Sequence, residues 1–105
     1  MSEQGIIRHI NEKVEESLPK LQPHIRSWAE KHLVNPKPID LSLNEKGEGE
    51  ITLWLVTDHI DNNDASCRVV YDSEKDSFGL EMTMANEVNW FMGYYGGFAE
   101  AVEAI

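Results

Sequence analysis

An apolar segment near the middle of the chain, residues 50–57, constrains the fold more than any other feature. It reads Glu-Ile-Thr-Leu-Trp-Leu-Val-Thr, and turn-forming residues flank it on both sides. Runs of β-branched and aromatic residues like this one are typical of a central strand that is covered on at least one face. Leu53 and Leu55 then point to one face, and Trp54 and Val56 point to the other. The pattern leaves open which pair faces the helices.

Three further segments alternate between apolar and polar residues, as half-buried strands do. They cover residues 39–44, 67–72 and 77–84. A glycine-containing loop leads into the central strand, a polar loop follows it at 58–66, and a four-residue turn at 73–76 precedes the last strand. Connections of this kind favour antiparallel neighbours, so we predict a four-stranded antiparallel meander.

The first third of the chain has helical spacing. Apolar residues recur every three or four positions over residues 3–18. Pro19 should end or kink this helix, and Pro23 suits the first turn of a second helix over 23–33. The alternative is a single helix that bends at Pro19. The segment that follows, 34–38, contains two prolines and is predicted to be an extended connector.

The end of the chain returns to helical spacing. A predicted helix begins after the N-cap Asn86 and has apolar residues at i, i+3, i+4 and i+7, which are Val88, Phe91, Met92 and Tyr95. The glycine pair at 96–97 should end it, and a last short helix is predicted over 98–105.

Helices at both ends of a chain, around antiparallel strands, define an α+β fold. We predict one domain over residues 1–105 with the order α-α-β-β-β-β-α, in which the helices pack mainly on one sheet face. The sheet residues expected to enter the core are Ile39, Leu41, Leu43, Ile51, Leu53, Leu55, Val69, Leu80 and Met82.

The net charge of −10 is unevenly distributed. Residues 1–38 carry six Lys or Arg against five Asp or Glu, a net of +1, whereas residues 39–105 carry three against fourteen, a net of −11. A negative field repels phosphate backbones, so nucleic acid is not an expected partner. It attracts basic proteins and speeds their encounter.

Location is predicted from what the sequence lacks. It starts without the basic and apolar segments of a signal peptide, and no apolar run approaches the roughly 18 residues of a membrane span. The one cysteine, Cys67, excludes an internal disulfide and fits a reducing compartment. We therefore predict a cytoplasmic protein that does not bind membranes.

The loop after the central strand holds the densest group of potential metal ligands. Asp58, Asp61 and Asp64 recur at intervals of three, with His59 among them, and carboxylate oxygens suit hard divalent cations. The spacing does not match an EF-hand, however, and Asp and Asn are also the ordinary residues of turns. A metal site on the three aspartates is therefore the weaker interpretation.

A nucleophile, base and orienting group are also present in Cys67, His59 and Asp58. No catalytic signature flanks this cysteine, and a free cysteine is most often a small buried apolar residue. We therefore predict that the protein is not an enzyme and uses no cofactor.

Residues 90–98 contain five aromatic side chains, which cannot all point to one face of a helix. Trp90 and Tyr94, four residues apart, would share a face other than the core face. Large amphipathic side chains outside the core are typical interface anchors. We predict Trp90, Tyr94 and Trp54 as partner-binding residues, although packing in the core is the alternative for each.

These observations together favour a non-catalytic acidic protein-binding domain. It could act as an antagonist or immunity-type protein, or as an adaptor, for a basic partner, or it could form a homodimer. The alternative hypothesis is a small-molecule or divalent-metal-binding protein with a pocket between the sheet and the aromatic C-terminal helix.

Overall fold

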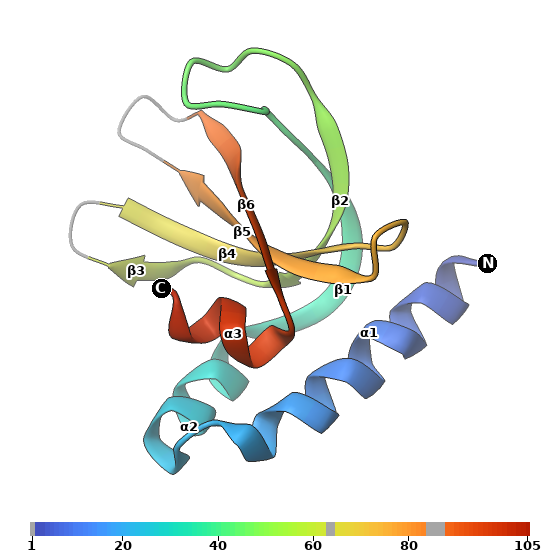
Figure 1. Ribbon diagram of the computed structural model, residues 1–105, viewed down its shortest axis with the longest axis vertical. Helices are drawn as coiled ribbons and strands as arrows, with labels where there is room; N and C mark the ends of the chain where they lie inside the picture. The colour runs from blue at the N-terminus through green and yellow to red at the C-terminus, as the bar shows by residue number, and fades with distance from the viewer. Residues whose placement is uncertain (1, 63–64, 84–87) are drawn as a thin grey trace.

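The computed structural model describes residues 2–62, 65–83 and 88–105 (Figure 1). Two helices come first, α1 (Glu3–Ser17) and α2 (Pro23–His32), joined by the 3-10 turn η1 (Leu18–Lys20). Six strands follow, and a short helix, α3 (Phe98–Glu103), comes last. The strands are β1 (Leu33–Leu41), β2 (Ile51–Thr57), β3 (Ile60–Asn62), β4 (Ala65–Asp72), β5 (Ser77–Thr83) and β6 (Asn89–Gly96).

The predicted α+β class is confirmed, and the first helical region is two helices rather than one bent helix. The α-helix ends at Ser17, two residues before Pro19, because a proline inside it would remove a hydrogen bond and clash with the preceding turn. Pro23 occupies the first position of α2, where its missing N–H costs nothing. Among the residues described, no helix combines the length and apolarity needed to cross a membrane.

The strands form one antiparallel sheet in the order β1-β2-β4-β5-β6, and β3 pairs with β4 outside this path. The predicted meander is therefore present, with one more strand in its main path. The polar loop predicted at 58–66 is shorter than expected, because β3 and the start of β4 lie within it.

Strand β1 begins earlier than its alternation predicted. It starts at Leu33 instead of Ile39 and includes both prolines of the expected connector. Pairing with β2 is irregular between Leu33 and Lys37 and regular from there to Leu41. Because β1 is an outer strand of the path, prolines are tolerated in it.

The helix predicted over 88–95 is wrong, because this segment forms strand β6. It pairs with β5 from Asn89 to Gly96, with irregular register on either side of Gly93. The expected cap, Asn86, lies outside the described residues. An i, i+3, i+4, i+7 pattern in a short aromatic segment also fits a bulged strand, and aromatic residues favour strands.

The sheet curls so that its two edge strands, β1 and β6, meet at one end. Ser42, just after β1, donates its N–H to the Asn89 carbonyl (2.8 Å) and accepts from the Phe91 N–H (2.9 Å). The curl gives the sheet an inner face, which no helix covers, and an outer face, against which all three helices pack (Figure 1).

The main core lies between the helices and the outer face. Trp54 and Val56 point to this face, so the helices cover them rather than Leu53 and Leu55. The fully buried members of this core include Ile10 of α1, Ala29 of α2 and Phe98 of α3, with Val56, Val69, Tyr71, Phe78 and Leu80 of the sheet.

A second, smaller core lies on the inner face. Leu41, Leu53 and Val70 are buried there without help from a helix, because the curl of the sheet covers them. Leu55 is also buried, so both faces of β2 are apolar and buried. Leu43, which was expected in the core, lies beyond the end of β1 and is 52% exposed.

Candidate functional site

The candidate site lies where β6 passes the turn between β4 and β5. Tyr94 of β6 is 40% exposed, and its hydroxyl donates to Asp72 Oδ2 at 2.5 Å. The other oxygen of Asp72 accepts the backbone N–H groups of Glu74 (2.9 Å) and Lys75 (3.3 Å). Asp72 is buried, so one carboxylate holds both the turn and the tyrosine in place.

Two further side chains, those of Phe91 and Lys75, contact the Tyr94 ring. Phe91 packs edge-on against it, with ring centroids 4.9 Å apart. The ammonium group of Lys75 lies 5.9 Å from the ring centroid, within the range of a cation–π contact. Burial, the hydrogen bond to Asp72 and the charges of Asp72 and Glu74 raise the pKa of Tyr94 to about 12. The carboxylates of Asp72 and Glu74 therefore act on this phenol, with the ammonium group of Lys75 beside the ring.

The other two predicted anchors are less accessible. Trp54 is half-buried and packs against the main core, so its contacts stabilise the fold. Trp90 is also half-buried, and its indole N–H is buried without a hydrogen-bond partner among the described residues. The structure thus does not bring the three predicted anchors together, since Trp54 lies on the covered outer face and Tyr94 contacts residues of the inner face.

The predicted metal ligands are only partly described. Asp58 is exposed, and its carboxylate contacts His32 Nδ1 at 2.7 Å. Asp61 lies in β3, but its side chain is outside the description, as is all of Asp64. Within the described part of the chain, no three His, Cys, Asp or Glu side chains are placed to hold a metal ion.

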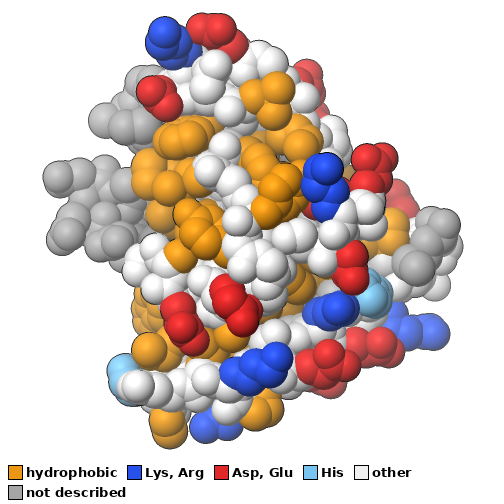
Figure 2. Space-filling model, viewed as in Figure 1, with side chains coloured by type: hydrophobic (Ala, Val, Ile, Leu, Met, Phe, Trp, Pro, Cys, Tyr) orange, Lys and Arg blue, Asp and Glu red, His pale blue; other side chains and the backbone are white. Residues whose placement is uncertain are grey.

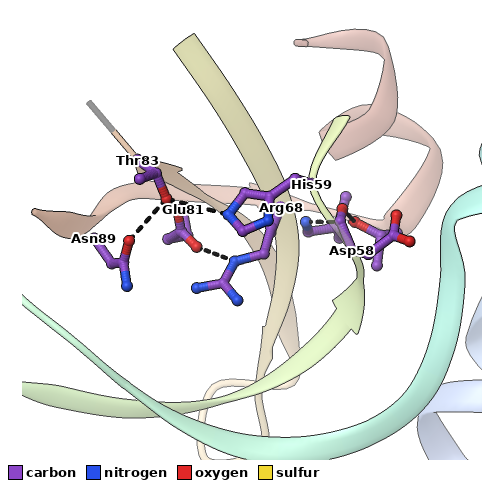
Figure 3. A network of polar contacts seen from close by, with 8 residues as sticks. Asp58, His59, Arg68, Glu81, Thr83 and Asn89 are labelled. Atoms are coloured by element: carbon purple, nitrogen blue, oxygen red, sulfur yellow. Dashed lines mark hydrogen bonds and ion pairs between the residues drawn. The ribbon is translucent and has the colours of Figure 1, made fainter. Parts of the chain in front are cut away.

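Figure 3 shows a polar network around Arg68, Glu81 and Thr83. In the register of β5 and β6, Thr83 pairs with Asn89, at the opposite end from the pair of Gly79 and Tyr94. Glu81 is fully buried, and its carboxylate accepts from Arg68 Nε and from the Thr83 hydroxyl (2.8 Å). Thr83 also contacts Asn89 (2.8 Å) and His59 Nε2 (3.3 Å). Neutralisation of Glu81 by Arg68 allows both charges to be buried beside the inner core.

The possible nucleophile Cys67 is buried on the outer face. Burial, followed by the charge of Glu81, raises the pKa of its thiol, so the thiolate is disfavoured. His59 contacts Thr83, and Asp58 contacts His32, so the described contacts do not assemble the three residues.

A second group of titratable residues joins α1 to the β4–β5 turn. Asp76 accepts from His9 Nε2 (2.9 Å) and from the Tyr71 hydroxyl, and Lys13 Nζ lies 3.5 Å from its second oxygen. The hydrogen bonds from Tyr71 and His9, with the charge of Lys13, lower the pKa of Asp76 to about 2. Burial and Asp76 raise the pKa of Tyr71, which makes this phenol a poor nucleophile. The group fastens the helix to the turn and borders a cavity of about 220 Å³.

An acidic hollow lies at the hairpin between β1 and β2. It has a volume of about 490 Å³ and is lined by Asp40 and Glu50, with no lysine or arginine among its described lining residues. Asp40 accepts from the Thr52 hydroxyl at 2.6 Å, whereas Glu45, Glu48 and Glu50 extend from the hairpin as exposed side chains.

Charge and apolar surface are distributed differently over the view in Figure 2. Hydrophobic side chains gather over the strands in the middle of its upper half, with charged side chains around their edge, and further Lys, Arg, Asp and Glu side chains lie over the helices in the lower half. The exposed large apolar side chains of the described chain are Leu43, Tyr94 and Tyr95. All three lie in residues 39–105, the acidic segment called the sheet half below.

Comparisons with protein-family models, with curated proteins and with solved structures found no significant match to this chain.

Sequence reasoning expected Tyr94 outside the core, and the ring is 40% exposed, but it missed the residues that surround the ring. The pattern of Asp72, Glu74 and Lys75 indicates only a strand end and a turn. The hydrogen bond between Asp72 and Tyr94 joins residues 22 positions apart, which a local pattern does not predict. The buried pair of Arg68 and Glu81 was missed too, although charged residues on one face of neighbouring strands are a signal for such a pair.

Proposed function

We propose that this protein is a non-catalytic acidic protein-binding domain whose partner presents a basic surface. The distribution of exposed apolar side chains carries the proposal. Leu43, Tyr94 and Tyr95 lie in the half of the sequence with a net charge of −11. The exposed apolar side chains and most of the negative charge therefore belong to the same segment of the chain, which suits a partner that combines apolar and cationic side chains.

A basic partner accounts for these features better than a homodimer does. Self-association through the sheet half would bring two strongly negative surfaces together, and like charges across an interface cost free energy. Opposite charges speed the encounter, and exposed aromatic residues supply contact area. Antagonist, immunity-type and adaptor roles all agree with this mode of binding.

The small-molecule alternative has less support. The segment predicted to form one wall of its pocket as a helix is strand β6. The metal alternative rests on three aspartates, of which only Asp58 has a described side chain, and that carboxylate contacts His32. We propose the cytoplasm as the location, because the single cysteine is free and buried, as is usual in reducing compartments.

The experiment is capture of partners at low salt, followed by affinity measurements with the purified partner over a range of salt concentrations. The expected partner is a basic protein whose affinity falls as salt rises. Glu50→Gln, in the sheet half, should weaken binding. Glu12→Gln, which makes the same change at an exposed position of α1, should have a smaller effect.

Two results would contradict the proposal. One is a partner of neutral or acidic surface whose affinity does not depend on salt. The other is an equal loss of affinity in the two variants, because net charge alone would then account for binding and the sheet half would have no special part in it.

A further inference from the structure

The Tyr94 ring is held in one position before any partner arrives. Its hydroxyl is fixed by the buried Asp72, and Phe91 packs against it edge-on. Asp72 is held in turn by two backbone N–H groups of the β4–β5 turn. A fixed, 40% exposed ring loses little conformational entropy when a ligand covers it, which favours its use in binding.

The surroundings of the ring favour a cation. The sheet half has only three Lys or Arg residues, and one of them, Lys75, places its ammonium group 5.9 Å from the ring centroid. Glu74, exposed in the same turn, adds a carboxylate whose charge acts on the phenol. The protein's own lysine therefore marks a place where the ring face accepts a positive charge.

We infer that the Tyr94 ring is the receptor for an arginine side chain of the basic partner, and that Lys75 occupies this place in the free protein. The inference rests on the proposed function, since it names the group that the partner supplies. A guanidinium is planar and weakly hydrated, so it stacks on an aromatic ring and pairs with a nearby carboxylate such as Glu74. Lys75 lies on an exposed turn, so its flexible side chain can move aside.

The test measures binding of a hexa-arginine peptide by calorimetry, with the ring resonances of Tyr94 followed by NMR. Lys75→Ala removes the competing ammonium group and should raise the affinity about two- to fivefold, the range expected for one exposed cation–π contact. Lys46→Ala makes the same change in net charge in the β1–β2 hairpin and should raise it by less than about twofold.

A second pair of variants tests the ring itself. Tyr94→Leu should reduce the affinity, while Tyr95→Leu, at the adjacent position with 36% exposure, should leave it nearly unchanged. Circular dichroism checks that each variant is folded. If Tyr94→Leu does not fold, the comparison of Lys75→Ala with Lys46→Ala and the Tyr94 shifts of the wild type decide the question.

Equal effects within each pair, or binding that leaves the Tyr94 resonances unmoved, would overturn the inference. Salt-dependent binding with these outcomes would leave the acidic protein-binding domain in place and move its contact elsewhere. Capture of a partner that is not basic would instead overturn the proposed function itself.

Discussion

Removal of the Arg68 guanidinium should be among the most destabilising changes at a charged position of this protein. Arg68 reaches the inner face of the sheet, where its Nε donates to the carboxylate of Glu81. Glu81 has no exposed surface, and the Arg68 side chain is only 15% exposed. Arg68→Met keeps most of the apolar stem and removes the charge.

The expected loss in free energy of unfolding follows from the surroundings of Glu81 in the Arg68→Met variant. Its carboxylate would keep the hydrogen bond from Thr83 but would be buried without a neutralising charge. Breaking a buried ion pair by removing one partner costs about 3–5 kcal/mol. A domain of this size has a free energy of unfolding of about 5–15 kcal/mol, so the variant should fold but be much less stable.

The assay is urea unfolding followed by tryptophan fluorescence, with circular dichroism to check that the transition is two-state. The double variant Arg68→Met/Glu81→Met removes both charges and should recover most of the lost stability, because an apolar pair suits the inner core. Lys46→Met, an exposed lysine of the β1–β2 hairpin, is the control and should change the stability by less than about 0.5 kcal/mol.

Two outcomes would refute this reasoning. A loss below about 1 kcal/mol in Arg68→Met would mean that Glu81 is not desolvated as the structure indicates. A double variant that loses as much stability as the single variants Arg68→Met and Glu81→Met added together would mean that the two side chains act independently.

Three further predictions concern the groups around the β4–β5 turn and strand β6. The folded-state pKa of Asp76 is lowered to about 2, so its stabilising contribution is complete above pH 4 and lost as pH falls through 2; acid unfolding of Asp76→Asn should therefore depend less steeply on pH in this range. The pKa of Tyr94 is raised to about 12, so the stability that it contributes is lost as pH rises from 10 through 12, and Tyr94→Phe should remove one tyrosinate absorbance step near pH 12. Gly79→Ala would place a methyl group 2.6 Å from the Phe91 ring and against the Gly93 carbonyl, so urea unfolding should show a loss of about 1–3 kcal/mol.

Strand β6 shows where a local pattern failed. Val88, Phe91, Met92 and Tyr95 satisfy helical spacing, yet the same segment offers aromatic side chains and two glycines that suit a bulged strand. Both conformations are possible locally. Pairing with β5 decided the matter, because a strand there meets the backbone hydrogen bonds of β5 and a helix would not.

The candidate site was predictable only in part. Tyr94 was expected outside the core because five aromatic residues cannot share one face of a helix, and the ring is exposed although the segment is a strand. Its hydrogen bond to Asp72 and its contact with Lys75 join segments about 20 positions apart, and no local signal predicts such contacts. Trp54 was predicted as a partner-binding residue but packs against the main core. An apolar run predicts that a strand is buried, but it does not predict which face the helices cover.

The sequence by itself determined the α+β class, a helical first third interrupted at Pro19, most of the sheet and the concentration of negative charge in residues 39–105. Hydrophobic periodicity, proline positions and charge counts act over a few residues or over composition, so they can be read directly from the chain. Only the tertiary structure decided the curl of the sheet, the strand at 89–96 and the surroundings of Tyr94. These depend on which distant segments meet, and that is set by the free energy of packing and pairing the whole chain.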